Sequence, residues 1–207
     1  MNTKKKILDA ALDLFSEKGY ANVFVAEIAE AVGIKAPSLY KHYKSKRDIF
    51  NAIIEEMKKN YNRQAATLSI DGNNAMSDAE VFSAASEDGL VKMGFSLFSF
   101  FLHDGYTQKF RKMLTIEQFH TPELAELFTK QYIDDSLKYQ SGIFSLLCER
   151  GILKGNNPQI MALQFHSPIY MLLTMCDREP EREKELTALL EQHIRQFVRL
   201  YSKGDHL

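Results

Sequence analysis

A glycine turn between two short helical segments is the feature that most constrains the fold of this chain. Residues 25–32 (VAEIAEAV) have a helical apolar pattern, Gly33 follows them, and Pro37 opens a second short helix. Glycine accepts the backbone angles of a sharp turn, and proline is tolerated in the first turn of a helix, where its missing N–H is not needed. Two short helices joined in this way have the layout of a helix-turn-helix.

The segment after the turn is basic. Between Lys35 and Arg47 the chain has five Lys or Arg residues and no Asp or Glu, with Tyr40, His42 and Tyr43 among them. Positive charge and hydrogen-bonding side chains on a short helix suit a DNA groove, because phosphates supply affinity and base edges supply specificity. A run of lysines is often only a solvated face, and its position directly after the turn is what favours DNA binding.

Charge is distributed unevenly along the chain. Residues 1–50 hold nine Lys or Arg and six Asp or Glu, whereas the remainder holds 17 and 21. A basic head on an acidic body fits a nucleic-acid module carried by a part with a different task. The 207 residues are 45% hydrophobic and 26% charged, which indicates a folded chain long enough for a small domain and a larger one.

Little in the sequence indicates export or a membrane. Cys148 and Cys176 are too few and too isolated for a disulfide framework or a zinc site, so we expect a reducing setting. An amphipathic pattern follows Lys4–Lys6, which argues against a signal peptide. The most apolar run, Phe95–Leu102, is far too short for a membrane span. We therefore predict a cytoplasmic protein that does not associate with membranes.

Helical periodicity extends through the whole chain. Ile7 and Phe15 lie on one apolar stripe of a first helix over about residues 4–18, which Thr3 can cap and Gly19 can end. Phe15, Ile28, Val32 and Leu39 are expected to form the core of the helix-turn-helix. Further helices are predicted over about residues 46–68, 81–101, 107–120, 121–150, 158–175 and 180–202. No stretch alternates at period two for long, so the predicted fold class is all-α.

Residues 5–55 resemble the N-terminal DNA-binding domain of TetR-type transcriptional repressors. The matching segments are KILDAALDLFSEKGY, IAEAVGI and PSLYKHYKSKRDIFNAII, in the right order and spacing. The resemblance implies a three-helix helix-turn-helix domain at residues 1–50. It also implies a larger helical domain at residues 51–207 that binds an effector and dimerises, with the fourth helix linking the two. Such proteins often carry Thr or Ser at the positions of Val23 and Phe24, and Arg or Lys at that of Ala26.

Resemblance and physical chemistry assign similar roles to the basic segment. The first residues of the recognition helix are expected to face base edges, while Tyr40, His42 and Lys46 are better placed for phosphate oxygens. Tyr43 is expected to be mostly packed. Because no Arg lies between Lys35 and Lys46, we expect modest base specificity per half-site. The predicted DNA-binding residues are Lys35, Ala36, Pro37, Ser38, Tyr40, Lys41, His42 and Lys46.

The body of the chain is rich in large, soft apolar side chains. Repressors similar to this one usually hold a small-molecule pocket there, and such side chains suit a hydrophobic effector, although core packing is the commoner role of each. Polar groups that can orient a ligand are His103, Glu117, Gln118, His120, Tyr139 and His166. The predicted pocket residues are Met93, Phe98, Phe101, Phe110, Met113, Phe119 and Tyr132.

Two long apolar helices close the chain. They offer more apolar surface than one small body needs, and pairing them with a second copy as a four-helix bundle would bury it; the alternative is core packing within one protomer. The predicted dimer-interface residues are Met161, Phe165, Ile169, Leu172, Ile194 and Phe197.

The sequence therefore predicts a ligand-responsive repressor that binds a pseudo-palindromic operator as a homodimer. The alternative is a helical dimeric interaction protein that keeps the helix-turn-helix shape without specific DNA binding. We expect no enzymatic activity, cofactor or metal, because motifs such as GxSxG, HExxH and a glycine-rich phosphate loop are absent from the sequence. Operator sequence, effector identity and the sign of the ligand's effect are not encoded in any recognisable pattern.

Overall fold

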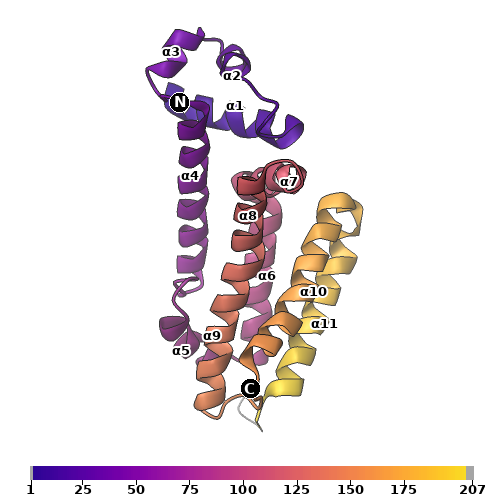
Figure 1. Ribbon diagram of the computed structural model, residues 1–207. Coiled ribbons are helices and arrows are strands. Elements are labelled where there is room, and N and C mark those ends of the chain that lie inside the picture. Colours follow the sequence, from indigo (N-terminus) through magenta and orange to yellow (C-terminus); the bar gives the residue numbers. More distant parts are fainter. Residues whose placement is uncertain (1, 204–207) are drawn as a thin grey trace. The chain divides into compact units, whose positions relative to one another are not determined.

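The computed structural model describes residues 2–203, and the regular secondary structure within that range is helical, apart from one isolated bridge between Leu153 and Ser202. The all-α prediction is confirmed. Two compact units divide the chain. Unit 1 holds the residues up to Tyr61 and the segment Asp104–Lys130, and unit 2 holds Asn62–His103 and the residues from Gln131 onward (Figure 1).

The helix-turn-helix lies in unit 1. Its helices are α1 (Thr3–Lys18), α2 (Val25–Val32) and α3 (Ala36–Tyr40), and α4 (Lys46–Thr67) follows them. Phe15, Ile28 and Leu39 are completely buried, as expected, whereas Val32 is only partly buried. Because α3 has only five residues, burial of Leu39 is what decides which of its sides faces outward.

Local capping explains where α1 and α2 begin and end. The predicted cap Thr3 is wrong, because the helix starts one residue earlier and the Asn2 side chain accepts a hydrogen bond from the Lys4 N–H at 3.0 Å. Gly19 ends α1 with φ 82° and ψ 154°, and Gly33 ends α2 in the left-handed region with φ 74° and ψ 31°. Both glycines therefore stand where their backbone freedom is required.

Two later helices complete unit 1, α7 (Gly105–Glu117) and α8 (Pro122–Thr129). Phe110 of α7 is completely buried, and its ring centroid lies 5.9 Å from that of Phe50 in α4. Polar contacts also tie α7 to α1. The Tyr106 hydroxyl donates to Asp9, and Lys109 pairs with Asp13. Residues about 100 positions apart in the sequence thus pack with the helix-turn-helix.

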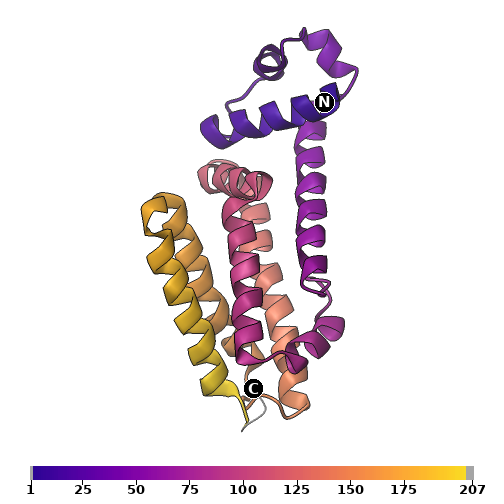
Figure 2. The ribbon, with the colours of Figure 1, turned by 180° about the vertical axis from the view of Figure 1, so that it is seen from behind.

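The long helices of unit 2 run alongside one another (Figure 2). They are α6 (Glu87–His103), α9 (Asp135–Glu149), α10 (Pro158–Arg178) and α11 (Glu183–Tyr201), and the short helix α5 (Ala75–Ala84) packs against α9. One apolar cluster joins α6, α10 and α11, and a second joins α9, α10 and α11. Leu172 and Ile194 lie in the first cluster, and Met161 and Phe197 in the second.

Two predicted helices are interrupted. The helix expected over 81–101 breaks between Ala84 and Glu87, because the Ser86 hydroxyl accepts a hydrogen bond from the Gly89 N–H at 3.1 Å and caps a new helix. The helix expected over 121–150 contains a π-helical turn, η1 (Lys130–Asp134), between α8 and α9. A 3-10 turn, η2 (Pro180–Arg182), precedes α11.

A buried carboxylate organises the loop before α5. Asp78 accepts hydrogen bonds from the backbone N–H groups of Asp71 and Gly72, both at 2.8 Å, and from the Tyr139 hydroxyl at 2.6 Å. These bonds replace the hydrogen bonds to water that the loop's N–H groups and the carboxylate lose on burial.

Of the helices formed by residues 2–203, none combines the length and apolar character required to cross a bilayer.

Gly19→Ala should destabilise the protein more than Gly33→Ala. A Cβ on Gly19 would lie 2.6 Å from the buried Glu117 Oε1, in a backbone conformation nearly confined to glycine, whereas a Cβ on Gly33 would meet no atom within 4 Å. We expect a loss of about 2–4 kcal/mol for Gly19→Ala and about 1 kcal/mol for Gly33→Ala, measured by urea unfolding. Equal losses would contradict the role of the Glu117 contact.

Candidate nucleic-acid interface

The outer surface of α3 carries most of the predicted DNA-binding residues. Lys35, Pro37, Tyr40, Lys41 and His42 are exposed. Ala36 and Ser38 are partly buried, and Leu39 points to the interior. The structure thus brings exposed basic and hydrogen-bonding side chains together on α3 and the residues that flank it, as a recognition helix requires.

The two tyrosines of this segment differ in environment. Tyr40 is 50% exposed, whereas Tyr43 is 5% exposed and its hydroxyl donates to the Lys4 carbonyl at 3.4 Å. Burial, with the nearby carboxylates of Asp9 and Glu56, raises the pKa of Tyr43 to about 12. Tyr43 therefore packs α3 against α1, and Tyr40 is the aromatic side chain available to a ligand.

Lys46 has partners within the protein. Its Nζ donates to the carbonyl oxygens of Tyr20 and Val23, both at 2.9 Å, and of Ala21 at 3.4 Å. Nζ also lies 4.4 Å from the centroid of the Tyr20 ring. Burial lowers the pKa of Lys46, while the carboxylates of Glu117 and Glu27 act in the opposite direction. The phosphate role expected for Lys46 stays a prediction, and the structure gives its ammonium a different task.

Glu117 of α7 reaches the same turn. It is 2% exposed, its Oε1 accepts from the Ala21 N–H at 2.9 Å, and its Oε2 accepts from the Thr121 hydroxyl at 2.5 Å. The sequence predicts Glu117 only as a polar group that can orient a ligand. Its buried contact joins segments 96 residues apart, for which the sequence carries no local signal.

The start of α2 lacks the hydroxyl cap common in similar proteins, and Glu27 supplies a substitute. Its Oε2 accepts from the Phe24 N–H at 2.7 Å, and its Oε1 accepts from Lys18 Nζ at 2.7 Å. Val23 is completely buried, whereas Phe24 is 71% exposed. The Glu27 carboxylate thus binds the backbone at the start of α2, where residues 23 and 24 carry no hydroxyl group.

Two further residues of the basic segment, Arg47 and Lys44, add to this description. Arg47 makes two hydrogen bonds to the Glu123 carboxylate, at 2.8 and 2.5 Å, so its charge is paired within unit 1. Lys44 is exposed and was not among the predicted DNA-binding residues. Its place in the same acid-free run as Lys41 is the signal that points to it.

The predicted pocket residues divide between the two units. Phe98 and Tyr132 are buried in unit 2, where Met93 and Phe101 are partly buried, and Phe110 and Met113 are buried in unit 1. Phe119 is 86% exposed, so its assignment to an enclosed pocket is not supported. The physical reason is that α7 ends at Glu117, earlier than expected, and Phe119 lies in the turn beyond it.

A polar contact connects η1 to α10. His166 Nε2 lies 2.9 Å from the Tyr132 carbonyl oxygen, and Nδ1 lies 3.4 Å from the Gln140 side-chain nitrogen. Because a carbonyl can only accept, Nε2 carries the proton and Nδ1 is the acceptor. Burial lowers the pKa of His166, although the bond to Tyr132 opposes the shift. The imidazole is therefore neutral.

Most of the predicted dimer-interface residues pack inside one protomer. Met161, Leu172, Ile194 and Phe197 are buried in the clusters of unit 2, and Phe165 and Ile169 pack against them partly buried. The core packing alternative is thus the one that describes these side chains. The apolar residues that α10 and α11 leave exposed are Ile160, Leu163, Met171, Leu189 and Leu200.

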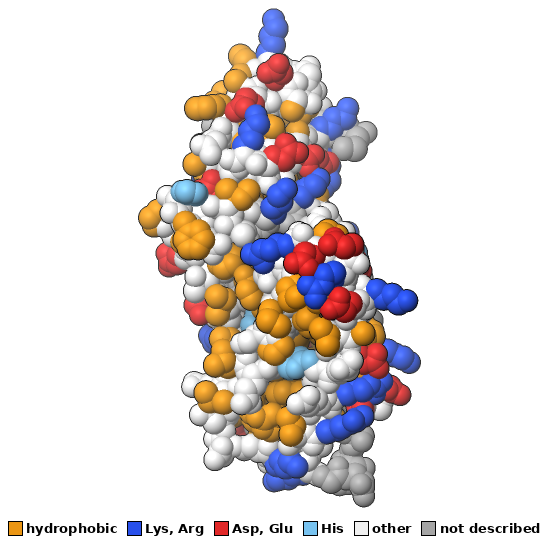
Figure 3. Space-filling model, turned by 90° about the vertical axis from the view of Figure 1, so that its right-hand side faces the viewer, with side chains coloured by type: hydrophobic (Ala, Val, Ile, Leu, Met, Phe, Trp, Pro, Cys, Tyr) orange, Lys and Arg blue, Asp and Glu red, His pale blue; other side chains and the backbone are white. Residues whose placement is uncertain are grey.

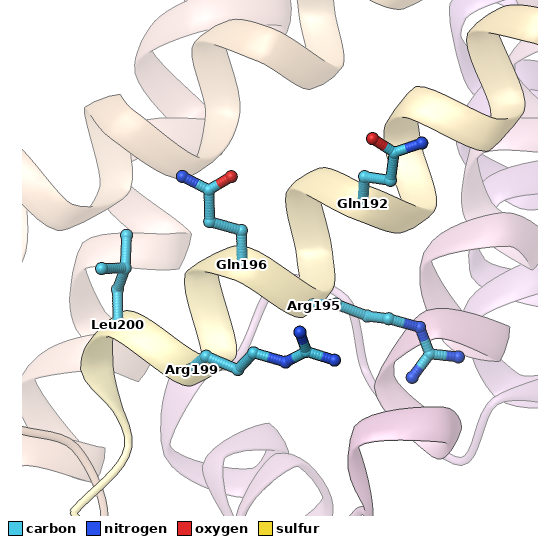
Figure 4. Close-up of a pocket in the computed structure, with 5 residues that line it drawn as sticks. All are labelled: Gln192, Arg195, Gln196, Arg199 and Leu200. Carbon is cyan, nitrogen blue, oxygen red and sulfur yellow. The ribbon is translucent and has the colours of Figure 1, made fainter.

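These exposed residues lie on a largely apolar surface. Hydrophobic side chains gather over the part of the molecule formed by α10 and α11, with charged side chains along its edge (Figure 3). A shallow hollow on α11 is lined by Gln192, Arg195, Gln196, Arg199 and Leu200 (Figure 4). Arg195 pairs there with Glu87, Asp88 and Glu191.

Within residues 2–203, no three His, Cys, Asp or Glu side chains gather in a way that would hold a metal ion.

Comparison with known proteins finds similar sequences for the helix-turn-helix segment. Residues 7–53 match the family model of bacterial regulatory proteins, tetR family. A segment of 52 residues is 46% identical to IcaR of Staphylococcus epidermidis, the HTH-type negative transcriptional regulator of the biofilm operon icaADBC. This match covers 25% of the present chain and 28% of IcaR, so it concerns the N-terminal part alone.

Solved structures extend the likeness to the whole fold. SmeT, the repressor of the Stenotrophomonas maltophilia multidrug efflux pump SmeDEF, aligns with a TM-score of 0.65 at 22% identity over 100% of this chain and 94% of SmeT. A TetR family transcriptional regulator from Pseudomonas syringae aligns with a TM-score of 0.63 at 16% identity over 96% of both chains. The helix-turn-helix followed by a larger helical part is thus a known arrangement.

His166→Gln should change how stability depends on pH. The folded-state pKa of His166 is lowered, so below about pH 6.5 the unfolded state binds the proton more readily and the folded state loses stability as pH falls. We expect the free energy of unfolding of wild type to fall relative to that of His166→Gln between pH 8 and 5.5. The slope of the difference is at most about 1.4 kcal/mol per pH unit.

The matched control is His103→Gln, because His103 is exposed and pairs with Glu183 at 2.9 Å. Urea unfolding at a series of pH values measures all three proteins. Parallel stability profiles for wild type and His166→Gln would contradict a buried neutral imidazole.

Proposed function

We propose that this chain, whose residues 7–53 match the model of bacterial regulatory proteins, tetR family, is a homodimeric transcriptional repressor. In this proposal it binds a pseudo-palindromic operator and releases it when a small hydrophobic effector binds. The observation that carries the proposal is the exposed surface of α3 and of the lysines that flank it, Lys35 and Lys41, with Leu39 of α3 buried. The curated relatives support the repressor role through their names, for the 28% of their length that is matched.

The proposed contacts follow from the exposure of each side chain. Pro37 and the partly buried Ala36 can pack on thymine methyl groups, and Ser38 can donate to or accept from a base edge. Lys41, Lys44 and the flexible side chain of Lys35 can reach phosphates or guanine acceptors. Tyr40 and His42, both exposed, can donate to phosphate oxygens.

Dimerisation is the proposed source of operator symmetry. Two recognition helices in a symmetric dimer meet successive major grooves about one helical turn apart. The exposed residues of α10 and α11, including Leu163, Met171 and Leu189, support a self-complementary helical interface. Charged residues are few on this surface. The same is true of the core of a protein–protein interface, because removing a charge from water is costly.

The proposed effector is small and hydrophobic. Unit 2 combines soft apolar side chains such as Phe98 and Met93 with the polar group formed by His166, Gln140 and the Tyr132 carbonyl. SmeT, whose fold is similar, has been solved in a complex with triclosan. A ligand releases DNA only to the extent that it binds the released conformation more tightly than the DNA-bound one.

The alternative function is a helical dimer that no longer reads DNA. Exposed Phe24, in place of a hydroxyl side chain, is the observation that favours it. An enzymatic function has less support, since the sequence carries no recognised catalytic motif. A cytoplasmic location is part of the regulator proposal, because that is where operator DNA lies.

Selection from random duplexes, repeated at several salt concentrations, tests the proposal directly. Enrichment of a palindrome whose affinity falls steeply with salt would support the repressor, because Lys and Arg contacts to phosphate release counterions. Weak binding without an enriched sequence would instead favour the interaction protein.

Lys41→Ala should reduce the salt dependence of DNA binding. If its exposed ammonium contacts a phosphate, the slope of log affinity against log salt should become less steep by about 0.9 for each half-site. Fluorescence anisotropy with a labelled operator provides the measurement. Lys154→Ala, which removes an exposed lysine of unit 2, is the control and should leave the slope unchanged.

Leu163→Glu should weaken the dimer. Leu163 is exposed on α10, and a charge buried at a helical interface without a partner costs several kcal/mol. Light scattering after size exclusion should show a shift from dimer to monomer at micromolar concentration. Met76→Glu changes an exposed apolar residue of α5 and is the control. A dimer that survives Leu163→Glu would place the interface elsewhere.

A further inference from the structure

The turn between α1 and α2, residues 19–24, is held largely by side chains from other elements. Backbone bonds within it are few: the Gly19 N–H donates to Phe15, and the Val23 N–H donates to Tyr20 at 3.5 Å. At its end, Phe24 is bonded to α2, where its N–H donates to the Glu27 side chain. Residues 20, 21 and 23 are contacted by Lys46 from α4 and Glu117 from α7. Because α2 begins directly after this turn, its direction depends on these two side chains.

The Lys46 ammonium uses all of its donors on the turn. An ammonium has three N–H groups, and Nζ lies within 3.4 Å of three carbonyl oxygens, those of Tyr20, Ala21 and Val23. The face of the Tyr20 ring occupies a further side at 4.4 Å. A phosphate could bind this ammonium only by displacing a carbonyl that holds the turn.

Glu117 completes the arrangement with the opposite charge. Its Oε1 takes the Ala21 N–H, while Lys46 takes the Ala21 carbonyl, so both peptide groups of this residue are bound by charged side chains. The carboxylate is almost fully buried, and its other oxygen is occupied by Thr121. Hydrogen bonds to charged groups are stronger than neutral ones, and removing one partner leaves the other buried without compensation.

We propose that Lys46 and Glu117 are positioning residues for DNA binding, which clamp the α1–α2 turn and set the direction of the helix-turn-helix without contacting DNA themselves. This inference rests on the proposed function, since it concerns how a DNA-binding head keeps its shape. It departs from the phosphate role predicted for Lys46. It also makes α7 part of the head, although the sequence-based boundary at residue 50 assigns α7 to the other domain.

The test compares variants by the salt dependence of operator affinity. A phosphate contact and a positioning contact differ in one measurable respect, because only loss of a phosphate contact makes the slope less steep, by about 0.9 for each half-site. Lys46→Gln and Glu117→Gln should each lower operator affinity on the order of tenfold at every salt concentration, with the slope of wild type. Lys44→Ala, which removes an exposed lysine nearby, is the control that should change the slope.

Lys46→Arg separates the two roles further. Arginine binds phosphate at least as well as lysine, so a phosphate role predicts affinity close to wild type. The planar guanidinium does not fit three carbonyls arranged around a compact ammonium, so the clamp predicts a loss similar to that of Lys46→Gln. A less steep slope for Lys46→Gln, wild-type affinity for Lys46→Arg, or wild-type affinity for Glu117→Gln would each overturn the proposal.

A measurement on the wild-type protein removes the dependence on how well variants fold. Lysine acetylation followed by mass spectrometry reports the accessibility of each ammonium. The clamp predicts that Lys46 reacts slowly both in the free protein and in the operator complex, whereas exposed Lys41 reacts quickly until DNA covers it. Fast reaction of free Lys46, with protection by operator, would overturn the proposal. Absence of operator binding by wild type would instead contradict the proposed function.

Discussion

Complete burial of Leu39, the one buried side chain of α3, is the constraint on which the proposed DNA-binding surface depends. A five-residue helix has little stability of its own, since nucleating a helix fixes several residues for each hydrogen bond gained. Packing therefore supplies the stability of α3, and the inward direction of Leu39 sends Tyr40, Lys41 and His42 outward. The charge pattern alone would be compatible with any solvated helix.

Charged and polar side chains perform structural tasks in unit 1 that simple counting of lysines does not reveal. Arg47 is paired with Glu123, Lys109 with Asp13, and Lys46 with carbonyl groups of the α1–α2 turn. Fewer basic side chains are consequently available to DNA than the run from Lys35 to Arg47 indicates. They centre on lysines that are exposed. Within unit 1, α7 supplies Lys109 and α8 supplies Glu123 as partners of residues in α1 and α4.

Much of the fold could be predicted because its signals are local. The bounds of α1, α2 and α10 follow from apolar spacing and from Gly19, Gly33 and Asn157-Pro158 at their ends. The break at Ser86 and the π-helical turn at Lys130–Asp134 escaped prediction, because a single cap or a turn of altered pitch hardly changes the apolar pattern. Phe119 was assigned to a pocket on residue type, and the early end of α7 leaves it exposed.

The sequence by itself determined the helical class, the helix-turn-helix and its basic surface, because periodicity, capping and turn geometry act over a few residues. Tertiary structure alone decided which partner each side chain has. It placed Met161, Leu172, Ile194 and Phe197 inside the protomer, left Leu163 and Met171 at the surface, and brought Glu117 to Ala21 across 96 residues. The reason is that apolar spacing shows which stripe of a helix is buried, whereas the packing of the other helices decides what covers it.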